Sequence, residues 1–225
     1  EAKVIAWDWG WNGHGMAREV IDKLPEDVWL MSVSEWAKPI ERGGVSNTVG
    51  EYSISAVGPG PRAKSHWSGA KKNLLKTVAK VQFNNTWELS VVPWLPVMDL
   101  VARHAANLAQ MDIDGVMLSW TLGSYPSPNL EIAKKFSHDP DASIEEVLNS
   151  LALERYGRAA VPYVRNAWTT FSTAFEEYPY DIRVVYTAPQ QYGPSNLLFL
   201  KPTGYRATMV GFPYDDLKGW SGPYP

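Results

Sequence analysis

The sequence DGVMLSWTLGSYPSPN, at residues 114–129, decides the fold class. Its apolar run at residues 116–118 is typical of a strand that is buried on both faces. An indole and a hydroxyl follow at Trp120 and Thr121, and a loop rich in Gly, Ser and Pro that includes Tyr125 comes next. In α/β barrels, functional groups lie at the carboxyl ends of parallel strands and in the loops behind them. Trp120 is therefore either part of such a site or the cap of a core.

The same order of strand, polar loop and helix occurs three times upstream. Four strands are predicted, at residues 4–9, 28–33, 77–83 and 114–120, and helices at residues 16–24, 62–76, 96–111 and 129–136. Each strand ends in polar and aromatic side chains that could form a site, whereas the strand starts carry only charged residues without aromatic neighbours of this kind, at Lys3, Asp27, Lys76 and Asp112. This asymmetry predicts an α/β fold with parallel strands over residues 1–137, arranged as a half or incomplete (β/α) barrel, that is, a TIM barrel.

Four βα units are half of a closed eight-stranded barrel and leave two sheet edges open. Three arrangements would cover them: an N-terminal half that precedes residue 1, a second copy of the chain, or some other cover. The chain starts in a strand without an initiator Met or a signal peptide, so we expect a piece of a longer protein.

Two other segments have a different pattern. Residues 37–61 hold five glycines, and we expect a long loop on the site face with an extended piece at residues 52–57. Residues 138–225 are predicted to form a helical extension. Its helices span residues 143–156, which open with the form of a capping box, and residues 159–177, before a tail rich in Pro, Gly and Tyr.

Composition narrows the function. The 225 residues carry a formal net charge of -3, which gives no electrostatic case for binding nucleic acid or an anionic membrane surface, and no apolar run approaches transmembrane length. There is no Cys and no nucleotide-binding loop, and the four His lack metal-ligand spacing, so we expect no cofactor and no metal. The most informative feature of the composition is the large number of aromatic residues. The chain has 11 Trp and 11 Tyr, and many of them lie beside Gly, Pro, Asn or Ser.

Three carboxylates lie at or shortly after the ends of predicted strands and are the candidate catalytic groups. They are Asp8, Glu35 and Glu88, and an indole adjoins each of them. Glycoside cleavage needs two such groups, one as acid and one as base or nucleophile, and a neighbouring indole can desolvate an acid. The alternatives are structural: Asp8 would bond a backbone loop, and Glu35 would anchor its loop through Arg42 or Lys38.

The strand ends also carry candidate sugar-binding residues. An indole ring can pack on the C–H face of a pyranose, and amides and imidazoles suit its hydroxyls. The set comprises Trp7, Trp9, Trp11, Asn12, His14, Trp36, Asn84, Asn85, Trp87, Trp120, Thr121 and Tyr125. Asn at a strand end is also a common turn former, and a lone His in a Gly-rich loop is a weak signal.

These motifs together resemble a known family. The segments WDWGWN (7–12), SEWAKPI (34–40), NNTWE (84–88) and SWTLG (119–123) are similar to the C-terminal half of a bacterial glycoside hydrolase barrel, most of all to relatives of the family 20 hexosaminidases. In that family the catalytic Asp-Glu pair follows the fourth strand, which would precede residue 1. In families whose nucleophile follows strand seven, Glu88 is the matching position. The two comparisons disagree.

The expected function is that of a glycoside hydrolase-like domain, completed by a missing N-terminal half or a second copy and exported to the periplasm or the cell exterior. Its partner would be a carbohydrate substrate, with no nucleic acid and no membrane. The alternatives are a non-catalytic carbohydrate-binding domain and an interaction domain that completes a barrel.

Overall fold

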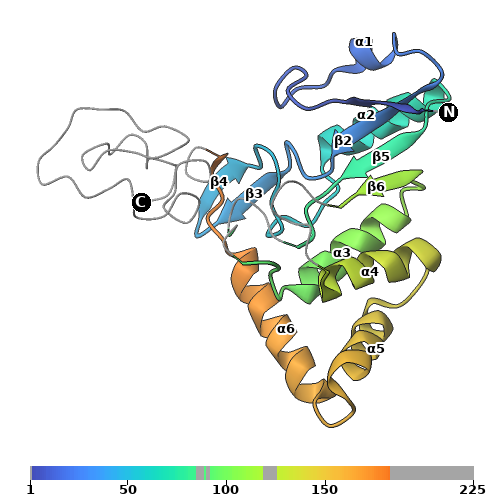
Figure 1. Ribbon diagram of the computed structural model, residues 1–225. Helices are drawn as coiled ribbons and strands as arrows, with labels where there is room; N and C mark the ends of the chain where they lie inside the picture. The colour runs from blue at the N-terminus through green and yellow to red at the C-terminus, as the bar shows by residue number, and fades with distance from the viewer. Residues whose placement is uncertain (1, 85–88, 90–91, 119–125, 183–225) are drawn as a thin grey trace, which may run out of the picture.

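A four-stranded parallel sheet organises the chain (Figure 1). The computed structural model describes residues 2–84, 89, 92–118 and 126–182. The strands are β1 (Val4–Trp7), β2 (Val28–Val33), β5 (Thr77–Lys80) and β6 (Gly115–Met117), and they lie side by side in chain order. All three pairings are parallel. The predicted α/β class with a parallel sheet is confirmed.

Helices connect the strands and continue beyond them. They are α1 (Arg18–Ile21), α2 (Pro61–Lys72), α3 (Met98–Ala109), α4 (Pro128–His138), α5 (Ile144–Tyr156) and α6 (Val161–Glu176). Ser143 caps α5 by accepting a hydrogen bond from the Glu146 amide, as the capping-box form predicts. Side chains of α2 to α6 share one apolar core with β5, so the predicted helical extension packs directly on α3 and α4.

The strand register gives the sheet two chemically different faces. Leu30 and Ala79 face the helices, where Leu30 packs on α1 and α2 and Ala79 joins the main core. The other face carries Trp7 of β1, Val33 of β2 and Lys80 of β5. We call this the site face, because polar and aromatic groups gather at its carboxyl end.

Residues 37–61 depart from the expected long loop. They contain an antiparallel hairpin, β3 (Pro39–Arg42) and β4 (Val45–Thr48). Gly43 and Gly44 form its two-residue turn with φ of 56° and 76°, a conformation that glycine adopts without a steric penalty. The extended piece predicted at residues 52–57 was wrong: this segment is a buried turn in which the Ala56 amide donates to the Ser53 carbonyl at 3.3 Å.

Several predicted elements were too long. The first helix was expected over residues 16–24, but α1 has only four residues. The second was expected to reach residue 76, but α2 ends at Lys72, and Leu74 has a φ of 60° that no helix can contain. The last residues of the strand predicted at 114–120 lie outside the described part of the chain.

A buried Ser–His pair fastens α3 to the end of β2. The hydroxyl of Ser34 lies 2.7 Å from Nε2 of His104, and the ring of Phe83 stands edge-on to the imidazole with centroids 5.4 Å apart. Gly58 passes so close that a Cβ there would clash with the His104 ring. Burial, and to a lesser extent the positive charge of Lys38, lowers the pKa of His104 to about 3.

This burial predicts acid sensitivity. The unfolded chain takes up a proton at His104 as the pH falls through about 6.5, whereas the folded chain does not, so stability is full above that pH and is lost below it. In chemical denaturation between pH 6 and pH 4, we expect the His104→Gln protein to lose about 1.4 kcal/mol less stability per pH unit than the parent. His138→Gln, at an exposed position on α4, serves as the control. Equal slopes for the parent and His104→Gln would contradict the burial argument.

Candidate active site

Side chains alternate in direction at the end of β1, so the indoles and the carboxylate of Trp-Asp-Trp lie on opposite faces of the sheet. Trp7 lies on the site face, and Trp9 stacks beside it with ring centroids 5.9 Å apart. Asp8, between them, points the opposite way and meets α2. Side chains of a strand alternate between its faces, and here the alternation continues past the strand end. The two indoles and the carboxylate therefore belong to different environments.

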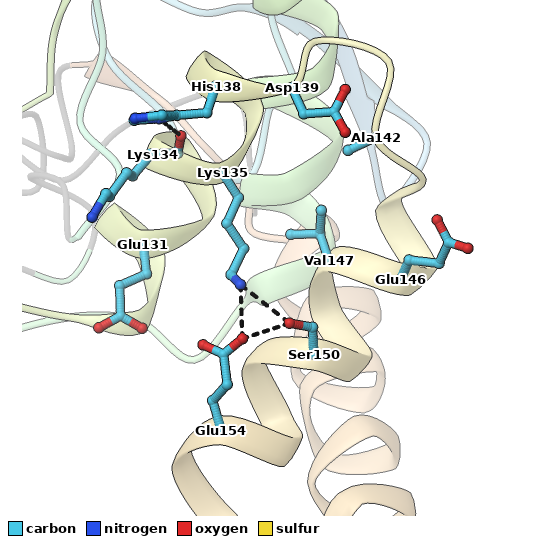
Figure 2. A pocket seen from close by; sticks show the side chains of 10 residues that line it. All are labelled: Glu131, Lys134, Lys135, His138, Asp139, Ala142, Glu146, Val147, Ser150 and Glu154. Carbon is cyan, nitrogen blue, oxygen red and sulfur yellow. Dashed lines mark hydrogen bonds and ion pairs between the residues drawn. The ribbon is translucent and has the colours of Figure 1, made fainter.

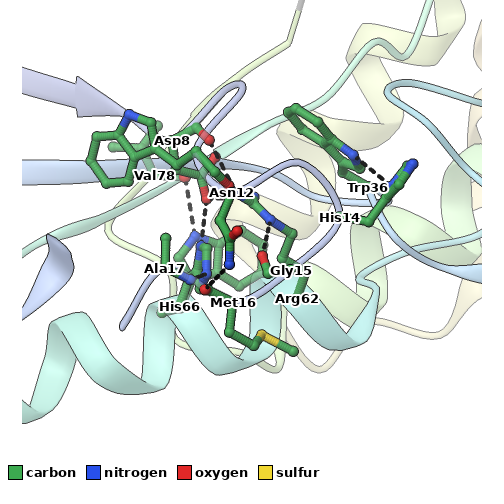
Figure 3. A network of polar contacts seen from close by, with 12 residues as sticks. Asp8, Asn12, His14, Gly15, Met16, Ala17, Trp36, Arg62, His66 and Val78 are labelled. Atoms are coloured by element: carbon green, nitrogen blue, oxygen red, sulfur yellow. Dashed lines mark hydrogen bonds and ion pairs between the residues drawn. The ribbon is translucent and has the colours of Figure 1, made fainter. Parts of the chain in front are cut away.

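Asp8 is the centre of a buried polar network (Figure 3). It has no exposed surface, and its Oδ2 accepts hydrogen bonds from Arg62 Nη1 at 2.9 Å and from His66 Nδ1 at 2.7 Å. The amide of Ala17 donates to His66 Nε2 at 2.9 Å, so the proton of a neutral His66 ring lies on Nδ1, facing Asp8. The structural alternative for Asp8, a carboxylate that holds a loop, accounts for these contacts.

The same network fixes the loop between β1 and α1. Arg62 donates to three backbone carbonyls of this loop, those of Asp8 (3.1 Å), Trp11 (2.8 Å) and Gly15 (3.0 Å). Its guanidinium also lies 4.9 Å from the ring centroid of Trp36, within range of a cation–π contact. One side chain of α2 thus holds both the loop and the indole that follows β2.

Three indoles form an aromatic cluster at the carboxyl end of the site face. The cluster consists of Trp7, Trp9 and Trp36, and the Trp9 and Trp36 centroids lie 6.2 Å apart. Trp36 is buried, but Trp9 keeps 48% of its surface exposed. His14 stands at the edge, where its Nδ1 accepts a hydrogen bond from Trp36 Nε1 at 3.0 Å. That bond leaves the Nε2–H of a neutral His14 as a donor.

A buried charged cluster adjoins the aromatic one. It consists of Glu35, Glu51 and Lys80, which are 1%, 5% and 0% exposed. Burial lowers the pKa of Lys80 to about 8, while the carboxylates of Glu35 and Glu51 act in the opposite direction, and the ammonium lies 5.3 Å from the ring centroid of Tyr52. Glu35 and Lys80 lie at the carboxyl ends of the parallel strands β2 and β5, where α/β folds carry out chemistry, and Glu51 comes from the segment after the β3–β4 hairpin.

The backbone holds Glu35 in place. Its Oε1 accepts a hydrogen bond from the Ser53 amide at 3.1 Å. Lys38 and Arg42, the anchors that the sequence suggested, donate to the backbone carbonyls of Val57 and Ser55. Glu35 is therefore oriented by the turn that follows the hairpin.

Three other candidate residues stabilise loops or pack in the core. Asn84 accepts a hydrogen bond from the Ser127 hydroxyl and its carbonyl accepts one from the Leu95 amide, so it joins two segments. Asn12 has a φ of 52° and donates to the Met16 carbonyl, which is the turn-forming role. The Trp11 side chain packs against the cluster under α1 and α2, away from the aromatic cluster.

The structure thus brings together Trp7, Trp9, His14, Glu35 and Trp36. The remaining candidates, Asn85, Trp87, Glu88, Trp120, Thr121 and Tyr125, lie outside the described residues.

Sequence reasoning missed Glu51, Arg62, His66 and Lys80. A signal existed for Lys80, because a lysine inside the apolar strand 77–83 has to lie on one of two buried faces. Gln82 shares its face by alternation, and its buried Nε2 has no hydrogen-bond partner among the described residues. No comparable signal marked Glu51, which follows a hairpin that the pattern did not predict.

A cleft of about 590 Å³ lies between α4 and α5 (Figure 2). Lys135 donates to Ser150 and to Glu154, and the Ser150 hydroxyl donates to Glu154. The charges of Lys135 and Glu154 at the centre of the cleft therefore form an ion pair with each other. The cleft is remote from the strand ends, and we assign it no role in the site.

Comparisons of the chain with protein-family models, with curated proteins and with solved structures found no match. In the described part of the chain, no helix has the length and apolar character to cross a membrane. Among the same residues, His, Asp and Glu side chains form no group of three suited to a metal ion.

The Arg62 network predicts a large stability effect. Arg62→Met leaves the Asp8 carboxylate buried without its guanidinium, and removing one partner of a buried pair typically costs about 3–5 kcal/mol. We expect a loss of that size in the free energy of unfolding, measured by chemical denaturation. Arg103→Met, which breaks a half-exposed pair with Glu176, is the matched control and should cost less than about 1 kcal/mol. Equal losses in the two variants would contradict the central role of Arg62.

Proposed function

We propose that this chain is one half of a glycoside hydrolase-like (β/α) barrel and that it binds a sugar on the aromatic cluster. The observation that carries the proposal is the contact of a half-exposed indole, Trp9, with the buried carboxylate of Glu51, next to Glu35 and Lys80 at the carboxyl ends of parallel strands. Sugar sites combine these two features, because indole rings pack on the C–H faces of a pyranose while charged groups bind its hydroxyls.

The sheet supports the barrel half of this proposal. The four parallel strands lie in chain order and are joined by helices, which is the arrangement expected of half of an eight-stranded barrel. Its edge strands expose apolar side chains: Val4 and Ile5 on β1 are 60% and 46% exposed, and Val116 and Met117 on β6 are each 46% exposed. An N-terminal barrel half or a second copy that paired with both edges would bury them.

The charges suggest a division of roles. The ammonium of Lys80 favours the ionised form of a neighbouring carboxylate, which suits Glu35 as a nucleophile, as a base or as a group that stabilises positive charge. The buried Nε2 of Gln82, which has no hydrogen-bond partner in the described part of the chain, suits a sugar hydroxyl. The acid would then be Glu88 or a residue of the missing half.

One observation favours the alternative, a non-catalytic carbohydrate-binding domain. Asp8, one of three candidate acids, is committed to Arg62 and His66. If the remaining carboxylates only bind hydroxyls, the same surface would hold a sugar without cleaving it.

Sugar binding is tested at Trp9. We expect Trp9→Ala to weaken binding of oligosaccharides at least about tenfold, equivalent to about 1.4 kcal/mol, as measured by calorimetry with chito-, cello- and xylo-oligosaccharides. Tyr163→Ala removes another exposed ring, on α6 far from the site, and should leave the affinity unchanged. If the parent protein binds none of these sugars, the proposed function fails.

Catalysis is tested at Glu35. With aryl glycosides as substrates, and in the presence of whichever chain completes the barrel, we expect Glu35→Gln to lower kcat at least about 100-fold and to change sugar affinity much less. Glu154→Gln, at the remote cleft, is the matched control. Binding without any cleavage by the parent would favour the non-catalytic alternative.

A further inference from the structure

Trp9 has a hydrogen bond that its exposure does not require. Trp9 is 48% exposed, yet its indole N–H donates to Oε1 of Glu51 at 2.6 Å. Glu51 itself is only 5% exposed. The bond stabilises the buried carboxylate, and it also restrains the exposed ring. For Trp9, what the bond provides is orientation of the ring.

The carboxylate is itself firmly placed. The Glu51 amide donates to the Tyr180 hydroxyl at 3.1 Å, which ties it to the segment after α6. Next to it, Gly50 passes so close to Ile182 that a Cβ would lie 2.7 Å away. On the other side, the Val49 amide donates to the Lys38 carbonyl at 2.9 Å. Glu51 therefore sits on a segment held from both sides, and it can hold Trp9 in turn.

Electrostatics strengthen this hydrogen bond. Glu51 lies near enough to Lys80 for its charge to act on the ammonium. Hydrogen bonds to ionised acceptors are shorter and about twice as strong as neutral ones. The N–O distance of 2.6 Å is short even for a charge-assisted bond.

We propose that Glu51 is a positioning residue that holds the Trp9 indole in the orientation in which a sugar packs on it. The proposal rests on the sugar site proposed above and adds a residue that the sequence did not suggest. Glu51 acts through Trp9, whose ring is tilted by 39° to that of Trp7 and by 54° to that of Trp36.

The test is a double-mutant cycle on sugar affinity. Glu51→Leu removes the acceptor, whereas Glu51→Gln keeps a neutral one, so we expect losses of at least about tenfold and of about twofold. Trp9→Phe keeps a ring but removes the N–H, and it should weaken binding on its own. In the Trp9→Phe background, Glu51→Leu should then cause no further loss. Calorimetry with chito-, cello- and xylo-oligosaccharides measures all four proteins against the parent.

The possible negative results of this cycle distinguish failure of the positioning role from failure of the sugar site. If Glu51→Leu costs the same affinity with and without the Trp9 N–H, Glu51 acts on the sugar or on the fold directly, and the positioning role is overturned while the sugar site stands. Full affinity in Glu51→Leu overturns it too. If Glu51→Leu does not fold, Glu51→Gln and Trp9→Phe decide: unchanged affinity in Trp9→Phe overturns the proposal. A parent protein that binds no sugar overturns the sugar site and the proposal together.

The indole N–H provides a readout that does not need a sugar. In ¹⁵N–¹H spectra, a charge-assisted bond moves the Trp9 Nε1–H proton downfield. We expect this signal to shift upfield in Glu51→Leu and by a smaller amount in Glu51→Gln. An unchanged signal would show that the bond is absent in solution and would overturn the proposal even if sugars bind.

Discussion

The buried contact between Arg62 and Asp8 is the interaction on which the candidate site depends. Both side chains are fully buried, so each ion needs the other and needs hydrogen bonds for its remaining polar atoms. Arg62 meets that need with backbone carbonyls of the loop after β1, and His66 donates a second hydrogen bond to the Asp8 Oδ2 that Arg62 also contacts. Since both Arg62 and His66 belong to α2, the loop can take only the path that satisfies them. Trp9 is presented on the site face because Asp8 is fixed on the other.

The two sheet faces divide the chemistry of the chain. On the helix face, polar side chains pair with helices: Asp8 with α2, and Ser34 with His104 of α3. On the site face, the charged and aromatic groups instead meet the segment that follows the β3–β4 hairpin, which supplies Glu51 and Tyr52. A hairpin inserted between β2 and α2 thus closes over the strand ends. The charged cluster is buried although it lies on the face that the helices leave uncovered.

The sequence predicted the framework better than the site. Strand and helix positions followed from apolar periodicity, because four βα units repeat the same order of patterns. The hairpin was missed because its strands are short and polar, and only Gly43-Gly44 marked its turn. Glu51 and Lys80 were missed for different reasons: Glu51 depends on that hairpin, whereas Lys80 looked like one polar residue within an apolar strand. Long-range partners such as Tyr180 of Glu51 leave no local pattern at all.

Asp8 shows how side-chain alternation distinguishes a structural carboxylate from a candidate functional one. In Trp-Asp-Trp at the end of β1, residues 7 and 9 share a face and residue 8 takes the other. In Val-Ser-Glu at the end of β2, Glu35 shares a face with Val33, which pairs with Lys80 in the sheet. Once one residue of this register is assigned to the site face, alternation places Glu35, Lys80 and Trp9 on the same face. Asp8 then lies on the opposite face, against the helices. A carboxylate that is adjacent to two indoles in sequence can therefore contact a different set of side chains, because each step along a strand reverses the side-chain direction.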